Sequence, residues 1–372
     1  MGISIYNTQT GKMVKKKPEK VSVCESLGPL EGHHMLKEIL EQQDTIRKAA
    51  DQDEGILIET AMDILRAKNV VFVACGTARY AAIVGRYLFS KVAKKFSEVI
   101  MAHEFQYFLD AVDSNTVVIA VSQSGETADV LEGVMKAKEK GTKLVSITNV
   151  PTSSLARISD RVFDIKCGPE IAVASTKAFT GQLAVLYRIA FATITRSYDA
   201  KSELEDIASK VGRMVCDLND TIEDLANKIK DKDDLYYLGR GIDFAIASEG
   251  ALKLKELSYQ HAEGMPAGEL KHGTLSLISK GTPVVAIAPK DYTFEETLNN
   301  ANEAKARGAF IIGVSDVKKS MFDVWIPIPA VKEVFYPMVA VIPLQMLAYY
   351  AAVARGNNPD KPRNLAKSVT VK

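Results

Sequence analysis

The two halves of this chain repeat one pattern of strands, helices and glycines at a nearly constant offset. In each half, an apolar strand ends in a glycine and leads into a helix rich in alanine, and a second apolar strand follows. A later helix then closes with glycine before a third apolar strand. The matched positions are Gly76 with Gly241 (241 − 76 = 165), Val121 with Ala288 (288 − 121 = 167) and Gly141 with Gly308 (308 − 141 = 167). Three matches in register indicate a duplicated unit.

Each half alternates strands with helices of a dozen residues or more, which predicts an α/β fold with parallel sheets covered on both faces. Ligands of such sheets bind at the carboxyl ends of the strands. Cys75-Gly-Thr and the turn that starts at Ser122 both fall there. Before the first repeat we expect helices at 34–50 and 55–67, and between the repeats a charged helical connector at 201–230.

Composition and charge exclude several classes of function. The 372 residues are 47% hydrophobic and 25% charged, with a formal charge of +1, so no overall field attracts nucleic acid. The four cysteines are scattered and lack the spacing of a zinc site or a disulfide scaffold. The one long apolar stretch, 336–354, contains two prolines and a glutamine, so we expect a buried helix and no membrane span. A cytoplasmic protein fits these features.

A hydroxyl-rich turn follows the strand at 116–121. Ser122, Gln123, Ser124 and Thr127 supply side-chain donors, and Gly125 allows a ligand to approach the backbone. The helix that begins near Thr127 directs its free amides at the same place. The pattern predicts a phosphate site, although a turn that merely caps a helix has the same residues.

A helix predicted from about 242 to 263 carries charged side chains on one face. Glu249, Lys253, Glu256 and Gln260 are spaced four, three and four residues apart. An exposed ladder of ion pairs has this spacing too. Because the helix starts at the carboxyl end of a strand, its carboxylate and amine are candidates for acid and base.

Three further segments carry candidate residues for chemistry. His272 lies in a turn-rich piece, where it is either a proton-transfer group or a surface histidine. Residues 173–175 offer small side chains and a hydroxyl before a long apolar helix. Lys367 lies among small and apolar residues of the C-terminal tail. If that tail enters the cleft, desolvation prepares the amine to form a Schiff base with a carbonyl.

These stretches together resemble the isomerase half of the glucosamine-6-phosphate synthases, the glutamine:fructose-6-phosphate amidotransferases. The resemblance runs from about His33 to the end of the chain. It is carried by Cys75-Gly-Thr77, Ser122-Gln-Ser-Gly-Glu-Thr127, Val173-Ala-Ser-Thr-Lys-Ala-Phe-Thr180, Glu249-Gly-Ala-Leu-Lys-Leu-Lys-Glu256, Gly268-Glu-Leu-Lys-His-Gly273 and Pro362-Arg-Asn-Leu-Ala-Lys-Ser-Val-Thr-Val371.

The resemblance implies two tandem sugar isomerase (SIS) domains, each a parallel five-stranded sheet flanked by helices in a flavodoxin-like, doubly wound sandwich. It divides the chain into a linker or remnant of a glutaminase domain at 1–31, a first SIS domain at 32–200, a helical connector at 201–230, a second SIS domain at 231–356 and a C-terminal catalytic tail at 357–372.

The resemblance also implies a role for each candidate residue. Lys367 would form an imine at C2 of open-chain fructose 6-phosphate, and Glu256 would move a proton between C1 and C2 with Lys253 nearby. His272, contributed by a neighbouring subunit, would assist ring opening, so a homodimer is expected. The phosphate would bind at Ser122, Gln123, Ser124 and Thr127, and the sugar at Thr77, Val173, Ala174 and Ser175. This chemistry uses no cofactor and no metal.

Two departures from the family pattern affect these expectations. Ala78 stands where the family commonly has serine, so one hydroxyl contact to the sugar is absent. The chain begins Met1-Gly2, whereas the glutaminase needs an N-terminal cysteine, so we expect no glutamine hydrolysis and a separate or missing glutaminase as the source of ammonia. The alternatives are an SIS-type glucosamine-6-phosphate deaminase and a non-catalytic sugar-phosphate sensor.

Overall fold

The computed structural model describes residues 5–6, 13–14, 32–194 and 198–370. The chain divides after Glu31 into a short N-terminal unit and a compact unit, Gly32–Lys372. In the N-terminal unit, strand β1 (Ile5–Tyr6) pairs antiparallel with β2 (Met13–Val14). The rest of the predicted linker lies outside the described residues.

The first repeat forms a five-stranded parallel sheet with the strand order β4-β3-β5-β6-β7. Its central strand, β5, has the sequence Thr-Val-Val-Ile-Ala-Val and is buried along its whole length. Such a continuous β-branched run is typical of a strand that has helices on both faces. The strands are β3 (Asn69–Ala74), β4 (Glu98–Met101), β5 (Thr116–Val121), β6 (Lys143–Thr148) and β7 (Arg161–Asp164).

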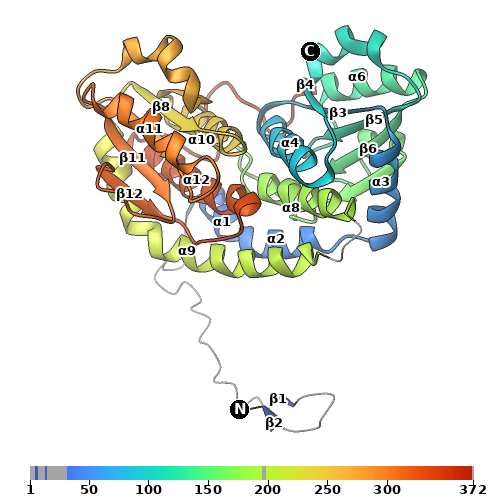
Figure 1. The fold of residues 1–372 in the computed structure, drawn as a ribbon, viewed down its shortest axis with the longest axis horizontal. Coiled ribbons are helices and arrows are strands. Elements are labelled where there is room, and N and C mark those ends of the chain that lie inside the picture. The colour runs from blue at the N-terminus through green and yellow to red at the C-terminus, as the bar shows by residue number, and fades with distance from the viewer. Residues whose placement is uncertain (1–4, 7–12, 15–31, 195–197, 371–372) are drawn as a thin grey trace. The chain divides into compact units, whose positions relative to one another are not determined.

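The second repeat forms another five-stranded parallel sheet, with the equivalent order β9-β8-β10-β11-β12. The matched sequence segments correspond to β3 and β8, β5 and β10, and β6 and β11, so the predicted duplication and the two parallel sheets are confirmed (Figure 1). The strands are β8 (Asp234–Gly239), β9 (His261–Pro266), β10 (Pro283–Ile287), β11 (Phe310–Ser315) and β12 (Val324–Pro327).

Helices cover both faces of the first sheet. The predicted helix at 34–50 is divided at Glu41 into α1 and α2, and the helix predicted at 55–67 begins one residue earlier, where the Asp53 carboxylate accepts a hydrogen bond from the Ile56 amide. The helices are α1 (His34–Leu40), α2 (Gln42–Ala50), α3 (Glu54–Arg66), α4 (Gly76–Leu88), α5 (Ala102–Phe105), α6 (Ala128–Glu139), α7 (Ser154–Ile158) and α8 (Lys177–Ala192), with the short turns η1 (Phe89–Ala93) and η2 (Gln106–Ala111).

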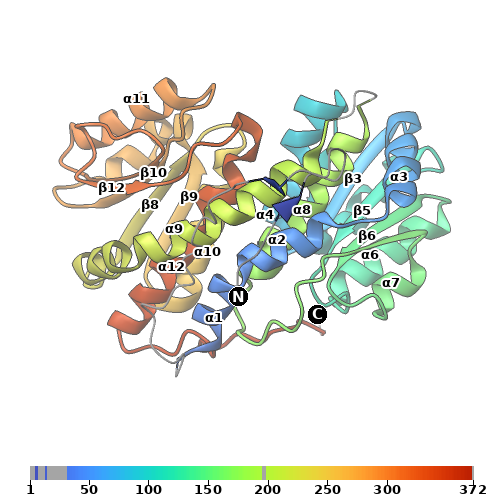
Figure 2. The ribbon, with the colours of Figure 1, turned by 90° about the horizontal axis from the view of Figure 1, so that it is seen from below.

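The helices of the second half begin with the predicted connector. It forms α9 (Ala200–Ile229), a single helix of 30 residues whose apolar face is buried against α2 and α12 (Figures 1 and 2). One face of the connector therefore belongs to the hydrophobic core, and its charged face lies on the surface. The others are α10 (Asp243–Ser258), α11 (Phe294–Lys305) and α12 (Tyr336–Ala354), with η3 (Ala267–His272), η4 (Thr274–Leu277) and η5 (Glu333–Phe335).

The helix predicted at 242–263 is shorter than expected. It ends at Ser258, Tyr259 adopts a left-handed φ of 61°, and residues 261–266 form the edge strand β9. Gln260 is therefore off the helix face, and its side-chain amide instead donates to the carbonyl oxygens of Ile229 (2.8 Å) and Lys232 (2.6 Å). The prediction extended the helix because the pairing of β9 with β8 is a tertiary contact that helical spacing does not reveal.

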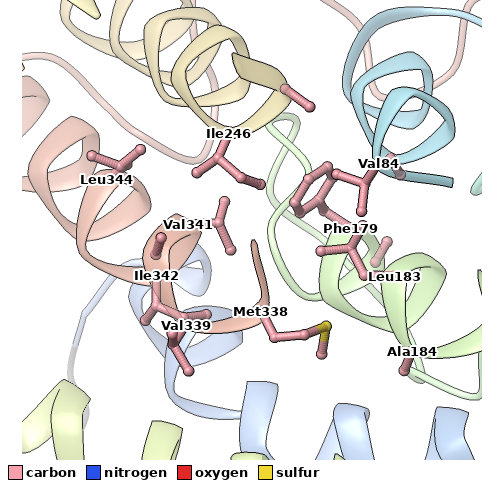
Figure 3. Packing of buried hydrophobic residues seen from close by; sticks show 14 of the residues in the cluster. Val84, Phe179, Leu183, Ala184, Ile246, Met338, Val339, Val341, Ile342 and Leu344 are labelled. Carbon is pink, nitrogen blue, oxygen red and sulfur yellow. The ribbon is translucent and has the colours of Figure 1, made fainter. Parts of the chain in front are cut away.

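Helix α12 lies at the centre of the core. Its length and composition would suit a membrane span, yet 89% of its apolar window is buried inside the fold, as expected for a core helix. Val341 lies near Ile246 of α10, and across from them are Val84 of α4 and Phe179 of α8 (Figure 3). The two sheets therefore share one continuous hydrophobic core, which fixes α10 against the first domain.

Candidate functional site

A cavity of about 330 Å³ lies at the carboxyl ends of β3 and β5. Its walls come from the first domain, from helix α10 of the second domain and from the C-terminal tail. Every residue predicted for the site lines this cavity except His272, namely Thr77, Ser122, Gln123, Ser124, Thr127, Val173, Ala174, Ser175, Lys253, Glu256 and Lys367. Segments far apart in the sequence thus converge on one place.

The hydroxyl-rich turn forms one end of the cavity. Ser122 Oγ accepts a hydrogen bond from the Gly125 amide and lies 3.1 Å from Thr127 Oγ1, and Ser124 Oγ accepts one from the Glu126 amide at 3.2 Å. Thr127 is the N-cap of α6 as expected, without a side-chain capping bond, so its hydroxyl faces the turn. The result is a group of hydroxyls beside a helix N-terminus, an arrangement that suits an anion.

Gly125 has a packing role that the sequence did not indicate. Its φ is 65°, and a Cβ atom built there would lie 2.1 Å from Ser153 Oγ. The glycine therefore allows the turn to pack against the start of α7. Glu126 fixes the same contact, because its Oε1 accepts the Ser154 amide at 2.7 Å.

The C-terminal tail crosses from the second domain to the first and ends beside α6 (Figure 1). Asp360 anchors its start, because the carboxylate accepts the amides of His34 and Met35, both at 2.8 Å, at the N-terminus of α1. Near the tail's end, Val369 O accepts the Ala128 amide and Ser368 Oγ donates to Ser124 Oγ. Lys367 lies between these anchors, so its side chain is placed in the cavity.

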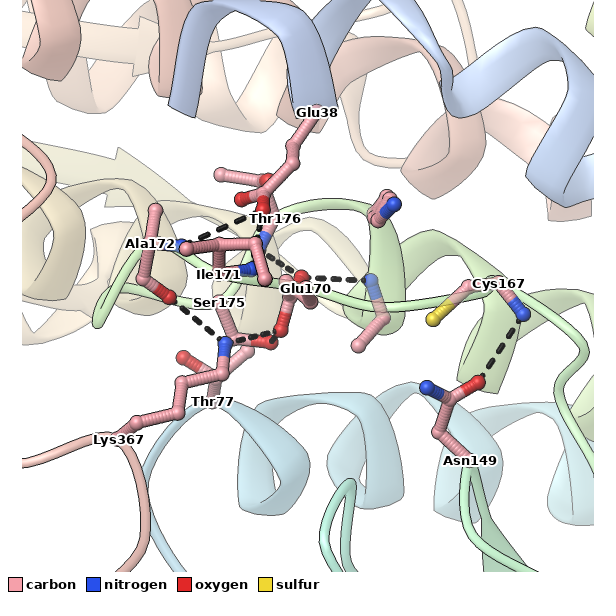
Figure 4. Close-up of polar contacts among 12 residues, drawn as sticks. Glu38, Thr77, Asn149, Cys167, Glu170, Ile171, Ala172, Ser175, Thr176 and Lys367 are labelled. Carbon is pink, nitrogen blue, oxygen red and sulfur yellow. Dashed lines mark hydrogen bonds and ion pairs between the residues drawn. The ribbon is translucent and has the colours of Figure 1, made fainter. Parts of the chain in front are cut away.

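Glu170 holds the Lys367 amine and was missed as a site residue by the sequence analysis. Lys367 Nζ donates to Glu170 Oε2 at 2.5 Å and to Ala172 O at 2.8 Å (Figure 4). Burial alone would raise the pKa of Glu170, but the Lys367 charge and the amides of Thr176 and Ala178 outweigh it, so the net pKa is lowered. Glu170 therefore remains a carboxylate although it is buried.

A second carboxyl group supports the same loop from α1. Glu38 Oε1 accepts hydrogen bonds from the amides of Ile171 and Ala172 (Figure 4). Burial, and to a smaller extent the charge of Glu170, raise the pKa of Glu38 to about 7 against the effect of those amides. Glu38 thus holds the segment whose Ala172 carbonyl oxygen accepts from Lys367.

Helix α10 brings three charged side chains to the cavity. Lys253 Nζ lies 2.6 Å from Glu256 Oε2 and 3.6 Å from Glu249 Oε1, and Thr77 Oγ1 donates to Glu249 Oε1 at 3.2 Å. Glu249 and Lys253 are 0% and 1% exposed, so the alternative of a surface ladder is wrong. Glu256, at 21%, is the most exposed of the three, and it lines the cavity together with Lys253.

The electrostatics of this cluster follow from its burial. Burial raises the pKa of Glu249 to about 8 in spite of the nearby Lys253 charge. Burial would lower the pKa of Lys253, but Glu249 and Glu256 outweigh it and raise that pKa to about 12. A proton on Glu249 and a charged Lys253 are therefore the states at neutral pH. Spacing placed Glu249 on the right helix face, but only the fold shows that it is buried.

His272 and Ala78 complete the predicted set. His272 ends η3 on the exposed surface of the second domain and does not line the cavity of its own chain. Ala78 lines the cavity with a methyl group in place of the hydroxyl that the family commonly has. Among the described residues, one group of three potential metal ligands lies close together, namely Cys75, His103 and Asp129.

Comparisons with known proteins agree with this fold. The family model of the SIS domain matches residues 63–192 and 228–355. Curated relatives include glutamine–fructose-6-phosphate aminotransferases (isomerizing) from Thermococcus kodakarensis, 46% identical over 379 residues, and from Caldanaerobacter subterraneus subsp. tengcongensis, 41% identical over 389 residues; each match covers 99% of this chain. The chain spans 63% and 64% of the length of these two relatives.

Solved structures give the same result. The C-terminal domain of glucosamine-fructose-6-phosphate aminotransferase from Francisella tularensis matches with a TM-score of 0.82 and 37% identity, covering 89% of this chain and 98% of that chain. A glucosamine-6-phosphate deaminase from Thermotoga maritima matches with a TM-score of 0.67 and 25% identity, covering 90% and 99%.

Proposed function

The chain belongs to the SIS domain family, with two such domains, and from this premise we propose that it is the sugar-phosphate isomerase part of a glucosamine-6-phosphate synthase. In this proposal it converts fructose 6-phosphate to an aldose 6-phosphate. The product is glucose 6-phosphate without ammonia and glucosamine 6-phosphate when ammonia is supplied. The observation that carries the proposal is the presence of the Lys367 amine in the same cavity as the hydroxyl-rich turn at 122–127.

The turn would bind the 6-phosphate. Its hydroxyls and the N-terminal amides of α6 supply hydrogen-bond donors and the positive end of a helix dipole, which suit a phosphate group. The segment Val173, Ala174 and Ser175, together with Thr77, lines the same cavity and would contact the sugar chain. With the phosphate at the turn, the sugar's carbonyl end would be directed toward Lys367.

Lys367 would attack C2 of the open-chain sugar as a neutral amine. The carbonyl oxygen leaves as water and a C2 imine remains, which acidifies the C–H bonds on C1. Glu170, whose Oε2 is 2.5 Å away, would hold and orient the amine. The proton that the ammonium form must lose before it attacks would pass to solvent in the cavity.

Glu256 would move the proton between C1 and C2. It is the partly exposed carboxylate of the α10 cluster and has Lys253 at 2.6 Å to stabilise its charged form. Ammonia that replaces the lysine would leave an ammonia-derived imine at C2, and proton transfer from C1 to C2 would turn it into an amine as C1 becomes the aldehyde. Water would release the lysine and leave the C2 ketone, and the same proton transfer through an enediol would leave a hydroxyl at C2. His272 of a neighbouring copy would assist ring opening, because the His272 of the same chain does not line the cavity.

The synthesis of glucosamine 6-phosphate needs a source of ammonia. More than a third of the length of the two curated relatives named above lies outside their match to this chain. We propose that a glutaminase outside the described residues or free ammonia supplies the nitrogen, and that the partners are a hexose 6-phosphate and a second copy of the chain, with neither nucleic acid nor membrane.

Conversion of fructose 6-phosphate to glucose 6-phosphate tests the proposal. Lys367→Ala and Glu256→Gln are each expected to lower kcat by about a hundredfold or more, since each removes a group that acts in the chemical step. Lys361→Ala, an exposed lysine in the same tail, is the matched control and should retain activity. Undiminished conversion by both variants would contradict the proposed roles.

A deaminase is the second candidate, because a deaminase structure also matches over 90% of the chain. The identity is 25% for that structure and 37% for the aminotransferase domain, which favours the synthase. Ammonia release from glucosamine 6-phosphate, compared with glucosamine 6-phosphate synthesis from ammonia and fructose 6-phosphate, separates the two. Faster release than synthesis at equal, saturating substrate would favour the deaminase.

A further inference from the structure

Three adjacent strands of the first sheet present potential metal ligands at their carboxyl ends. Cys75 follows β3, His103 follows β4 on one side of it, and Asp129 begins α6 after β5 on the other side. One ligand atom from each residue lies within 4.8 Å of the other two. The grouping is a consequence of the sheet order, because these residues are up to 54 positions apart in the sequence (129 − 75 = 54).

We propose that Cys75, His103 and Asp129 form a binding site for a divalent transition-metal ion of the Zn²⁺ class. Thiolate, imidazole and carboxylate together are the ligands of Zn²⁺ and Co²⁺, whereas Mg²⁺ and Ca²⁺ prefer oxygen alone. Three protein ligands leave a fourth tetrahedral position for water. With a thiolate and a carboxylate, the loaded site is neutral overall.

The present spacing is close to what coordination requires. Metal–ligand bonds of about 2.0–2.3 Å in a tetrahedron place the ligand atoms roughly 3.3–3.8 Å apart. The atoms must therefore come together by about 1 Å. The side chain of His103 is half exposed and has room to move, and Cys75 and Asp129 are partly buried and more firmly placed.

The surroundings support a bound metal. The amides of Ala102 and His103 donate to the Cys75 sulfur and so hold it in place. Metal binding would displace the thiol proton to solvent. An entry path exists through a second hollow of about 280 Å³, which His103 and Asp129 line together with the carboxylates of Glu104 and Glu132.

Occupancy of this site would inhibit the isomerase. Cys75 and Asp129 both line the substrate cavity, so drawing them together narrows the end of it that holds the hydroxyl-rich turn. This consequence rests on the proposed function, whereas metal binding itself does not. Zn²⁺ should therefore raise the apparent KM for fructose 6-phosphate.

Co²⁺ titration followed by absorption tests metal binding without substrate. The wild-type chain should give a thiolate-to-cobalt charge-transfer band and the visible bands of a tetrahedral ion, and Zn²⁺ should bleach both while Mg²⁺ should not. Cys75→Ser and Asp129→Asn should abolish the tetrahedral spectrum. His103→Ala should weaken Co²⁺ binding by more than tenfold, since loss of an outer-shell partner alone typically costs about 10–100-fold.

Cys167→Ser removes the other free thiol among the described residues. This control variant should keep the Co²⁺ absorption spectrum of the wild type. No charge-transfer band in the wild type, or an unchanged band in Cys75→Ser, would overturn the site. Activity forms the second arm. His103→Ala should keep its basal rate and lose sensitivity to Zn²⁺, and equal inhibition of this variant and the wild type would overturn the inhibitory role.

Discussion

Burial of charged side chains sets the chemistry of the cavity. Glu249 and Lys253 are almost completely removed from water, and Glu170 is buried beneath Lys367. Burial would neutralise each carboxyl group, but the partners differ. The Lys367 charge and two backbone amides outweigh burial at Glu170, so its pKa is lowered. Glu249 must share the Lys253 charge with Glu256, so burial prevails and its pKa is raised. Two buried carboxyl groups thus hold opposite protonation states.

The pKa of Glu249 predicts a pH-dependent contribution to stability. Its folded value of about 8 lies above the ordinary value of about 4.3, so the folded state keeps a proton that the unfolded state releases. This contribution is fully present below pH of about 4.3 and is lost as the pH rises to about 8. The slope is at most about 1.4 kcal/mol per pH unit, since a single proton is involved.

Glu249→Gln should therefore flatten this dependence. Urea unfolding at pH 5 and pH 8 should show that the free energy of unfolding of the wild type falls by more than that of the variant over the interval. Glu104→Gln, an exposed carboxylate, is the control and should behave as the wild type. Parallel pH dependence in wild type and Glu249→Gln would contradict the account.

The sequence predicted some of these residues and missed others for a physical reason. Ser122 to Thr127 and Lys367 lie in segments whose composition already indicates an anion and an amine site. Glu170 and Glu38 have no such signal. Their importance comes from tertiary contacts among α1, the loop at 170–175 and the tail. Glu38 bonds to Ile171, 133 positions away, and Glu170 bonds to Lys367, 197 positions away.

At the scale of elements, the turn between β5 and α6 depends on its glycine. Gly125→Ala would place a Cβ 2.1 Å from Ser153 Oγ at a positive φ, so we expect a loss of about 2–3 kcal/mol in stability and weaker phosphate binding. Gly281→Ala is the matched control, because Gly281 also has a positive φ, of 82°, but its nearest contact is 3.5 Å away at a flexible lysine end.

Urea unfolding and titration with inorganic phosphate check this prediction. The control should lose about 1 kcal/mol, which is the cost of a left-handed alanine alone, and should bind phosphate as the wild type does. Equal behaviour of the two variants would show that the contact with Ser153 does not shape the turn.

Elements were predictable where local pattern and tertiary structure agree. Buried β-branched runs and glycine-closed helices in register predicted the strands β3, β5 and β6 and their counterparts. The C-terminal end of α10 was not predictable, since β9 forms by pairing with β8 and Gly264 allows that strand to pass close to Ser248. Helical spacing alone extended the helix over this strand.

At the scale of the molecule, one cavity uses parts of both domains. Helix α10 and the tail come from the second half, and the turn at 122–127 comes from the first. His272 is the exception, since it lies on the exposed surface of η3, and the expected role for it requires a second copy of the chain.

Mixing two inactive variants tests that requirement. If each site combines Lys367 of one copy with His272 of the other, a mixture of His272→Asn and Lys367→Ala should form hybrid dimers with one intact site. Random exchange would restore about a quarter of the wild-type activity. Activity that stays at the sum of the two separate variants after exchange of subunits would contradict a shared site.

The central claim is that a tail lysine forms an imine with a sugar whose phosphate is bound by the first sheet. Borohydride reduction in the presence of fructose 6-phosphate, followed by peptide mass spectrometry, tests it most directly. The account predicts a reduced hexose phosphate adduct on Lys367, which excess inorganic phosphate suppresses. An adduct on another lysine, or no adduct on an enzyme that is turning over, would contradict it.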